Sequence, residues 1–123
     1  MKKKLWLFIF ANLIIILSIS CEKTTTTTSQ QATVKQGALL FWTNDPSMLN
    51  FCGVLTVKLS NGQQTNITGY YFVAPANCVN QFGGYLYVNE GSYSYQVTSG
   101  FGCSISGGTI TVIGDQCNMA RVQ

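Results

Sequence analysis

Four cysteines carry the clearest chemistry in this chain, because a thiol can form a disulfide, bind a metal ion or attack a substrate. Cys52, Cys78, Cys103 and Cys117 are separated by 26, 25 and 14 residues. No two of them form a CxxC pair, the spacing typical of zinc sites and thioredoxin-like redox sites. An even number of cysteines in a short exported domain indicates disulfides. We expect two disulfides and favour Cys52 with Cys103 and Cys78 with Cys117, although the sequence leaves all three pairings open.

Groups able to perform catalysis are sparse. The chain contains no histidine, which removes the Ser-His-Asp and Cys-His arrangements and the commonest general base near neutral pH. A pair of carboxylates could hydrolyse a glycosidic bond. However, each of the three carboxylates, Asp45, Glu90 and Asp115, lies in a predicted turn. Exposure to solvent there gives a carboxyl group no special reactivity. We therefore expect no catalytic residue, no metal site and no cofactor, and we predict that the chain is not an enzyme.

Cys21 has a different setting, at the end of an apolar segment. Three lysines at positions 2–4 precede an apolar run over residues 5–19. As a helix, fifteen residues would span roughly 22 Å, short of the ~30 Å hydrocarbon core of a bilayer. The run therefore indicates a signal peptide rather than a membrane-spanning helix.

The segment Leu17-Ser18-Ile19-Ser20-Cys21 resembles the lipobox of bacterial lipoproteins, with the usual leucine one place further from the cysteine. The resemblance implies cleavage after residue 20, a diacylglyceryl group on the Cys21 thiol and acylation, for example by palmitate, of the new amine. Two or more acyl chains hold a protein stably on a membrane without crossing it. We predict a lipid-anchored protein of the bacterial cell envelope, on the outer membrane, with its periplasmic or surface face left open. The alternative is an ordinary secretory signal in which Cys21 is incidental.

Residues 21–36 form the expected lipidated tether, because they contain five consecutive threonines and almost nothing apolar to bury. The formal charge of the whole chain is +3, and the three lysines at positions 2–4 supply all of it. The other charges cancel, so no basic patch is expected to bind nucleic acid. These balanced residues are Lys23, Lys35, Lys58 and Arg121 against Glu22, Asp45, Glu90 and Asp115.

From residue 37 to residue 123, short alternating apolar runs are separated by turn residues, a pattern typical of an all-β domain. We expect one seven-stranded antiparallel β-sandwich stabilised by disulfides, without a helix. The expected strands cover residues 38–43, 53–59, 65–73, 84–89, 92–98, 109–113 and 117–122. Alternation assigns one apolar set to the core: Leu55, Val57, Leu59, Leu86, Val88, Tyr93, Tyr95, Val97, Ile110 and Val112.

The domain also holds an excess of aromatic residues, twelve between positions 37 and 123. We expect Trp42, Tyr85, Tyr87 and one of Tyr70 or Tyr71 on outward faces, where a ring with a polar tip favours contact with a glycan or a protein. The alternative is aromatic pairing across strands that only stabilises the sheet.

Several motifs resemble those of small Bacteroidota-type lipoprotein domains: Phe41-Trp42-Thr43, Cys52-Gly53-Val54-Leu55-Thr56-Val57 and Pro75-Ala76-Asn77-Cys78. Two later motifs are similar to those of prealbumin-like or PEGA-like β-sandwiches: Glu90-Gly91-Ser92-Tyr93-Ser94-Tyr95 and Gly107-Gly108-Thr109-Ile110-Thr111-Val112. The resemblance implies the sandwich fold and no common activity.

These features favour a non-catalytic envelope lipoprotein that binds a protein partner or serves as an accessory module. Two alternatives remain open. The first is a glycan-binding surface lipoprotein that uses Trp42, Tyr85 and Tyr87. The second is an inhibitor of an envelope hydrolase, a task that suits rigid disulfide-bonded domains.

Overall fold

The computed structural model describes residues 31–123. The expected signal peptide, Cys21 and most of the expected tether lie outside the described residues. Residues 32–123 form one compact unit. This unit contains the seven strands and both disulfides found in the described residues, so the core between the sheets lies entirely within it. Within residues 31–123, no helix has the length and apolar character needed to cross a membrane.

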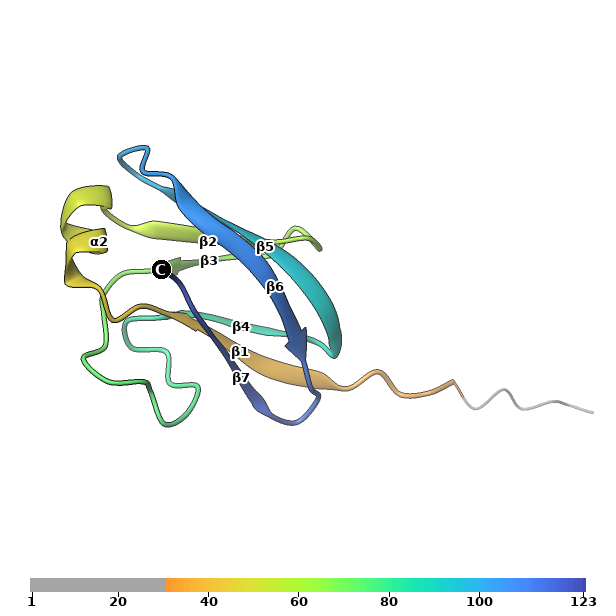
Figure 1. Ribbon diagram of the computed structural model, residues 1–123. Helices are drawn as coiled ribbons and strands as arrows, with labels where there is room; N and C mark the ends of the chain where they lie inside the picture. The colour runs from red at the N-terminus through yellow and green to blue at the C-terminus, as the bar shows by residue number, and fades with distance from the viewer. Residues whose placement is uncertain (1–30) are drawn as a thin grey trace, which may run out of the picture. The chain divides into compact units, whose positions relative to one another are not determined.

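Seven strands form two sheets that pack face to face (Figure 1). Sheet A has the order β4 (Gly84–Asn89), β1 (Gln36–Trp42), β7 (Cys117–Arg121). Sheet B has the order β3 (Gln64–Ile67), β2 (Leu55–Leu59), β5 (Gly91–Ser99), β6 (Ile105–Val112). The expected sandwich-like, mostly β fold is confirmed.

The expectation that every strand pair is antiparallel is wrong for sheet A, because β1 and β7 are parallel. The reason lies in the chain path. Strand β6 ends beside the start of β1, and a short turn then begins β7 at the same end of the molecule (Figure 1). Asp115 in that turn donates its backbone N–H to the carbonyl oxygen of Gln36 at 2.8 Å, which aligns the two strand starts.

The core lies between the sheets and follows the predicted alternation. Leu55, Val57 and Leu59 of β2 are buried, while Lys58 between them is exposed. Phe41 of β1 is fully buried and packs edge-on against Tyr95 of β5, with ring centroids 4.9 Å apart. The other residues assigned to the core from the sequence are also buried or packed against it: Leu86, Val88, Tyr93, Val97, Ile110 and Val112.

A short helix, α2 (Pro46–Cys52), is present although no helix is expected from the sequence. Asp45 caps its start by accepting a hydrogen bond from the Ser47 backbone N–H at 2.8 Å, and Pro46 occupies the first turn, where its missing N–H costs nothing. Hydrogen bonds from Ser47 hold the pKa of the Asp45 carboxyl below its usual range. Seven residues are too few for a helical period to stand out, so Asp45-Pro46 was interpreted only as a turn.

The expected strand over residues 65–73 is the largest error in strand bounds. Strand β3 ends at Ile67, and residues 68–83 form an irregular loop that leads to β4. Strand β6 also begins four residues earlier than expected, at Ile105.

Both disulfides have the pairing that we favoured from the sequence. Cys52 at the end of α2 is joined to Cys103, which lies just before β6. Cys78 in the 68–83 loop is joined to Cys117 at the start of β7.

Candidate functional site

The aromatic residues predicted to face outward share the outer face of sheet A. In the pairing of β4 with β1, Tyr85 lies opposite Leu40 and Tyr87 lies opposite Ala38, so these four side chains are on the same face. Trp42 is two residues after Leu40 in β1, so its side chain is on that face as well. Tyr87 is 53% exposed, whereas Trp42 and Tyr85 are half-buried. Glycan binding by these three residues stays a prediction.

Leu40 shows that part of this outer face is covered. It is fully buried although it points away from the core between the sheets. The backbone of Gly83 lies against it, since a Cβ atom added at Gly83 would be 2.7 Å from Leu40 Cδ1. The 68–83 loop therefore lies over sheet A and buries apolar surface there.

Backbone hydrogen bonds close the 68–83 loop at its base. The N–H groups of Thr68 and Gly69 both donate to the carbonyl oxygen of Phe82, at 2.9 and 3.1 Å. The N–H of Tyr71 donates to the carbonyl oxygen of Thr43 at 2.9 Å, which ties the loop to the end of β1. The two ends of the loop are thus held together and held to sheet A.

The Tyr71 side chain forms a second set of links inside the loop. Its hydroxyl donates to the carbonyl oxygen of Val79 at 3.3 Å and accepts from the N–H groups of Phe82 and Gly83 at 3.3 and 3.4 Å. The rings of Tyr71 and Phe82 pack edge-to-face with centroids 5.7 Å apart. One side chain therefore connects three backbone positions of an otherwise irregular segment.

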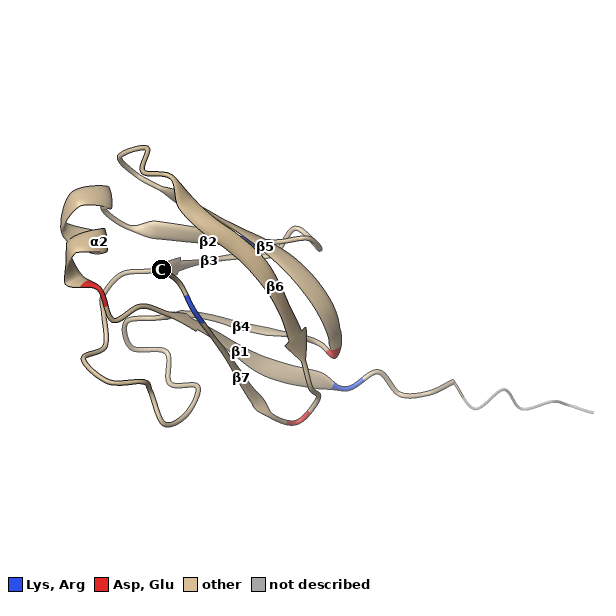
Figure 2. Ribbon diagram, viewed as in Figure 1, with Lys and Arg blue, Asp and Glu red and all other residues tan. Residues whose placement is uncertain are grey.

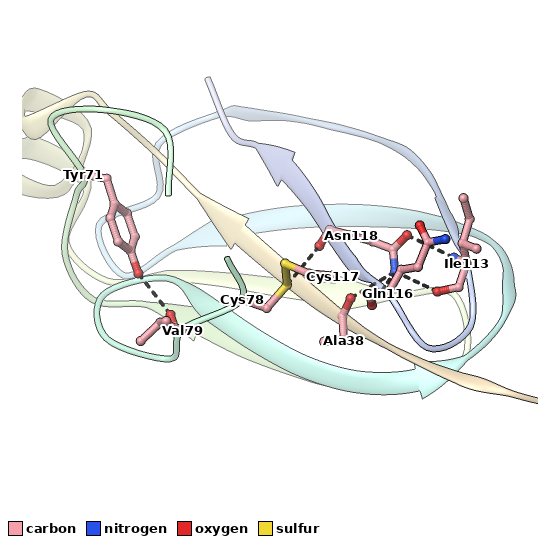
Figure 3. Close-up of a disulfide and its surroundings, with 8 residues drawn as sticks. All are labelled: Ala38, Tyr71, Cys78, Val79, Ile113, Gln116, Cys117 and Asn118. Atoms are coloured by element: carbon pink, nitrogen blue, oxygen red, sulfur yellow. Dashed lines mark hydrogen bonds between the residues drawn. A yellow bond between two sulfur atoms is a disulfide. The ribbon is translucent and has the colours of Figure 1, made fainter. Parts of the chain in front are cut away.

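The disulfide from Cys78 to Cys117 fixes the loop covalently to β7 (Figure 3). Hydrogen bonds of Asn118 fix the start of β7 next to this disulfide. The Asn118 side chain donates to the carbonyl oxygens of Ala38, Ile113 and Gln116 at 3.1 to 3.2 Å. It also accepts from the N–H of Ile113 at 3.0 Å. The loop is thus anchored to a rigid part of the sandwich.

The 68–83 loop exposes apolar side chains and lines a cavity that is open to solvent. Phe72 is 87% exposed and Val73 is 77% exposed. Beside them lies a mostly apolar cavity of about 450 Å³. Its lining comes entirely from the loop: Thr68, Gly69, Tyr70, Tyr71, Phe72, Val73 and Phe82. Burial of these side chains would be favourable, since apolar surface gains free energy on leaving water.

Three of the six charged residues between positions 31 and 123 lie together at the end of the domain opposite the loop. No charged residue occurs between Lys58 and Glu90 in the sequence. Lys35 and Asp115 form an ion pair of 3.0 Å at the end of the sandwich where β1 begins, and Glu90 lies beside them (Figure 2). The hydrogen bond and the charge of Asp115 raise the pKa of Lys35 above its usual value. These three charged residues thus lie at the end where β1 begins, whereas the 68–83 loop and α2, with Asp45 at its start, lie at the other end (Figures 1 and 2).

The three carboxylates considered for catalysis are not brought together. Asp45 caps α2, whereas Glu90 and Asp115 flank Lys35 at the opposite end of the sandwich (Figure 2). Within the described residues, no group of three or more His, Cys, Asp or Glu side chains could hold a metal ion. That the chain is not an enzyme stays a prediction.

No protein-family model, no curated protein and no solved structure matches this chain. The resemblance to Bacteroidota-type lipoproteins and PEGA-like sandwiches stays a prediction.

The sequence contained two indications of the loop that alternation alone missed. The run Tyr70-Tyr71-Phe72-Val73-Ala74 is continuously apolar or aromatic and is flanked by Gly69 and Pro75, residues typical of loops. In β1, Leu39, Leu40 and Phe41 are consecutive apolar residues, a pattern typical of a strand covered on both faces. Together these patterns favour an apolar segment outside sheet A.

Gly69 should be essential for the shape of the cavity. A Cβ atom at this position would lie 2.7 Å from Phe82 Cδ1, so Gly69→Ala must displace the Phe82 ring. Crowding of this kind costs about 1–3 kcal/mol of stability. Urea unfolding of residues 32–123 measures the loss.

The matched control for Gly69→Ala is Gly100→Ala, where the nearest atom to an added Cβ is the Cys52 carbonyl oxygen at 3.9 Å. We expect Gly100→Ala to leave the free energy of unfolding nearly unchanged. Equal losses in the two variants would show that the contact between Gly69 and Phe82 does not hold the loop.

Proposed function

We propose that this chain is a non-catalytic lipoprotein of the bacterial cell envelope, anchored to the outer membrane through Cys21, that binds a protein partner through its 68–83 loop. The observation that carries the binding proposal is the exposure of Phe72 and Val73 beside an apolar cavity, on a loop held by a disulfide. Contiguous apolar surface of this kind typically marks an interaction site. A loop fixed before binding also loses less conformational entropy when it binds.

The position of the loop leaves it accessible to a partner, because it lies away from the point where the tether enters. The proposed tether enters the domain just before β1, near Lys35, and the 68–83 loop projects from the opposite end (Figure 1). A lipid anchor at Cys21 would thus leave Phe72 and Val73 directed toward other molecules of the envelope.

A protein partner is favoured over a glycan at this surface. Sugars are bound through hydrogen-bonding groups as well as ring faces, and the cavity lining is mostly apolar. Glycan binding at Trp42, Tyr85 and Tyr87 is the weaker alternative, because two of these three rings are half-buried. An inhibitor of an envelope hydrolase would be a special case of the favoured proposal, with the hydrolase as the partner.

Cys21→Ser tests the anchor. In cells fed a radiolabelled or alkyne-tagged palmitate, we expect the wild-type chain to carry the label and to sediment with membranes. Cys21→Ser should lose both properties, because serine has no thiol to accept the diacylglyceryl group. Cys78→Ala, made together with Cys117→Ala, is the control and should keep the label. Labelling that persists in Cys21→Ser would contradict the proposed lipidation.

A further inference from the structure

We infer that the protein partner of the 68–83 loop is a second copy of this chain, with Phe72 of each copy seated in the cavity of the other. The inference rests on the proposed function, since it identifies the partner of the same surface. A two-fold dimer of this kind uses one self-complementary patch on both subunits.

The patch has the two complementary parts that such a dimer needs. The Phe72 ring protrudes, and the cavity of about 450 Å³ next to it has apolar walls. Phe72 also forms part of the cavity lining, and its ring packs edge-to-face on Tyr70 with centroids 5.1 Å apart. A protruding ring and a cavity that accepts a ring therefore lie side by side on one surface.

The charge distribution also suits association of identical copies. A patch of one charge sign repels itself, but residues 59–89 contain no charged side chain. Over residues 31–123 the charges cancel, a balance that promotes self-association. They are three cations, Lys35, Lys58 and Arg121, and three carboxylates, Asp45, Glu90 and Asp115.

The available area predicts a weak interface that a membrane anchor would strengthen. A buried aromatic residue covers roughly 150–250 Å². Phe72, Val73 and their partly exposed neighbours therefore offer on the order of 500 Å² per copy, or about 1,000 Å² in the dimer, at the low end for a specific interface. Anchoring both copies to one membrane raises their effective concentration, which compensates for low affinity. We thus expect association to be weak in solution and strong on the membrane.

Photo-crosslinking of the full-length chain in its membrane tests the inference. Phe72 is replaced by p-benzoylphenylalanine, a phenylalanine analogue that reacts with neighbouring C–H bonds under ultraviolet light. We expect a product of twice the chain mass, and mass spectrometry should find position 72 joined to a peptide from residues 68–82 of a second copy. The same analogue at position 101 is the control, because Phe101 is 76% exposed but lies in the β5–β6 connection of the other sheet.

The products separate the inference from the proposed function. Attachment to a different protein would overturn the dimer and leave the proposed function standing. Attachment to lipid alone, or no attachment, would overturn both.

Sedimentation equilibrium of residues 32–123 supplies a second readout. We expect a monomer–dimer equilibrium with a dissociation constant in the high micromolar to millimolar range. This constant should change little between about 0.05 and 0.5 M salt, because the interface contains no ion pair. Phe72→Ser should weaken association at least tenfold, and Phe101→Ser should not. Because Phe72 is largely exposed, both variants should fold, which circular dichroism checks. A wild-type domain that stays monomeric in solution and on the membrane would overturn the dimer.

Discussion

Replacing Cys52 and Cys103 together by alanine should lower the free energy of unfolding of residues 32–123 by about 4 kcal/mol. The disulfide joins residues 51 apart in sequence, and its loss returns that much freedom to the unfolded chain. A domain of this size buries only about 60% of its unfolded surface, so its total stability is thin. A loss of this size should lower the melting temperature by roughly 20 °C.

The same variant should have a local structural effect. The Cys52 carbonyl oxygen accepts a hydrogen bond from the Phe101 N–H at 3.2 Å, and the Val54 carbonyl oxygen accepts one from the Gly100 N–H at 3.3 Å. The two bonds hold the end of α2 and the residues between α2 and β2 to the β5–β6 connection beside the disulfide. Amide hydrogen exchange at Gly100 and Phe101 should therefore accelerate, while Tyr71 in the 68–83 loop keeps its protection.

Calorimetry and urea unfolding measure the global effect, with the oxidised wild-type domain as the comparison. A destabilisation below about 1 kcal/mol would mean that the unfolded chain is already compact without this cross-link.

The two faces of β2 show why much of the fold could be predicted. Leu55, Val57 and Leu59 alternate with Thr56 and Lys58, and this alternation depends only on the two-residue period of a strand. The even count of four domain cysteines likewise predicts two disulfides, which the structure confirms. Local rules were sufficient wherever one face of a strand is buried and the other is solvated.

The 68–83 loop was missed because its structure depends on distant residues. Tyr70 to Val73 have high β-propensity and predict a strand, but they pair with none of the strands in the described part of the chain. Their place is set instead by the Thr43 carbonyl oxygen and by Cys117. Neither contact can be read from the residues of the loop.

Sheet A presents the same difficulty. The parallel pairing of β1 with β7 joins residues about 80 positions apart, for example Ala38 with Cys117. Alternation identifies each strand but not its neighbours or their direction. Only the consecutive apolar residues of β1 indicate that a further segment covers this sheet.

Replacing Cys78 and Cys117 together by alanine is the prediction with the largest expected effect on binding. This disulfide joins residues 39 apart, so its loss should also cost about 4 kcal/mol in the chain-entropy account. The 68–83 loop would keep its backbone hydrogen bonds at the base but would lose its covalent link to β7. We therefore expect the sheets to persist while the loop becomes mobile.

Hydrogen exchange should locate this loss in the loop. The N–H of Tyr71, bonded to Thr43, and the N–H of Gly83, bonded to the Tyr71 hydroxyl, should exchange faster than in the wild type. The N–H groups of Gly100 and Phe101 should not change. The two disulfide variants thus serve as controls for each other. Loss of Cys52–Cys103 should speed amide exchange in the β5–β6 connection only, and loss of Cys78–Cys117 should speed it in the 68–83 loop only.

Self-association should separate the two variants even though their global destabilisation is similar. A mobile loop must be ordered again on binding, and each immobilised side chain costs about 0.5–1.5 kcal/mol. Tyr70, Tyr71, Phe72 and Phe82 all belong to the cavity, so their combined ordering should weaken the dimer more than tenfold. The double variant with both Cys52→Ala and Cys103→Ala should leave the dimer intact at temperatures where the domain is folded. If instead both variants lose self-association equally, the binding surface extends to α2 and the β5–β6 connection, and the 68–83 loop alone does not account for it.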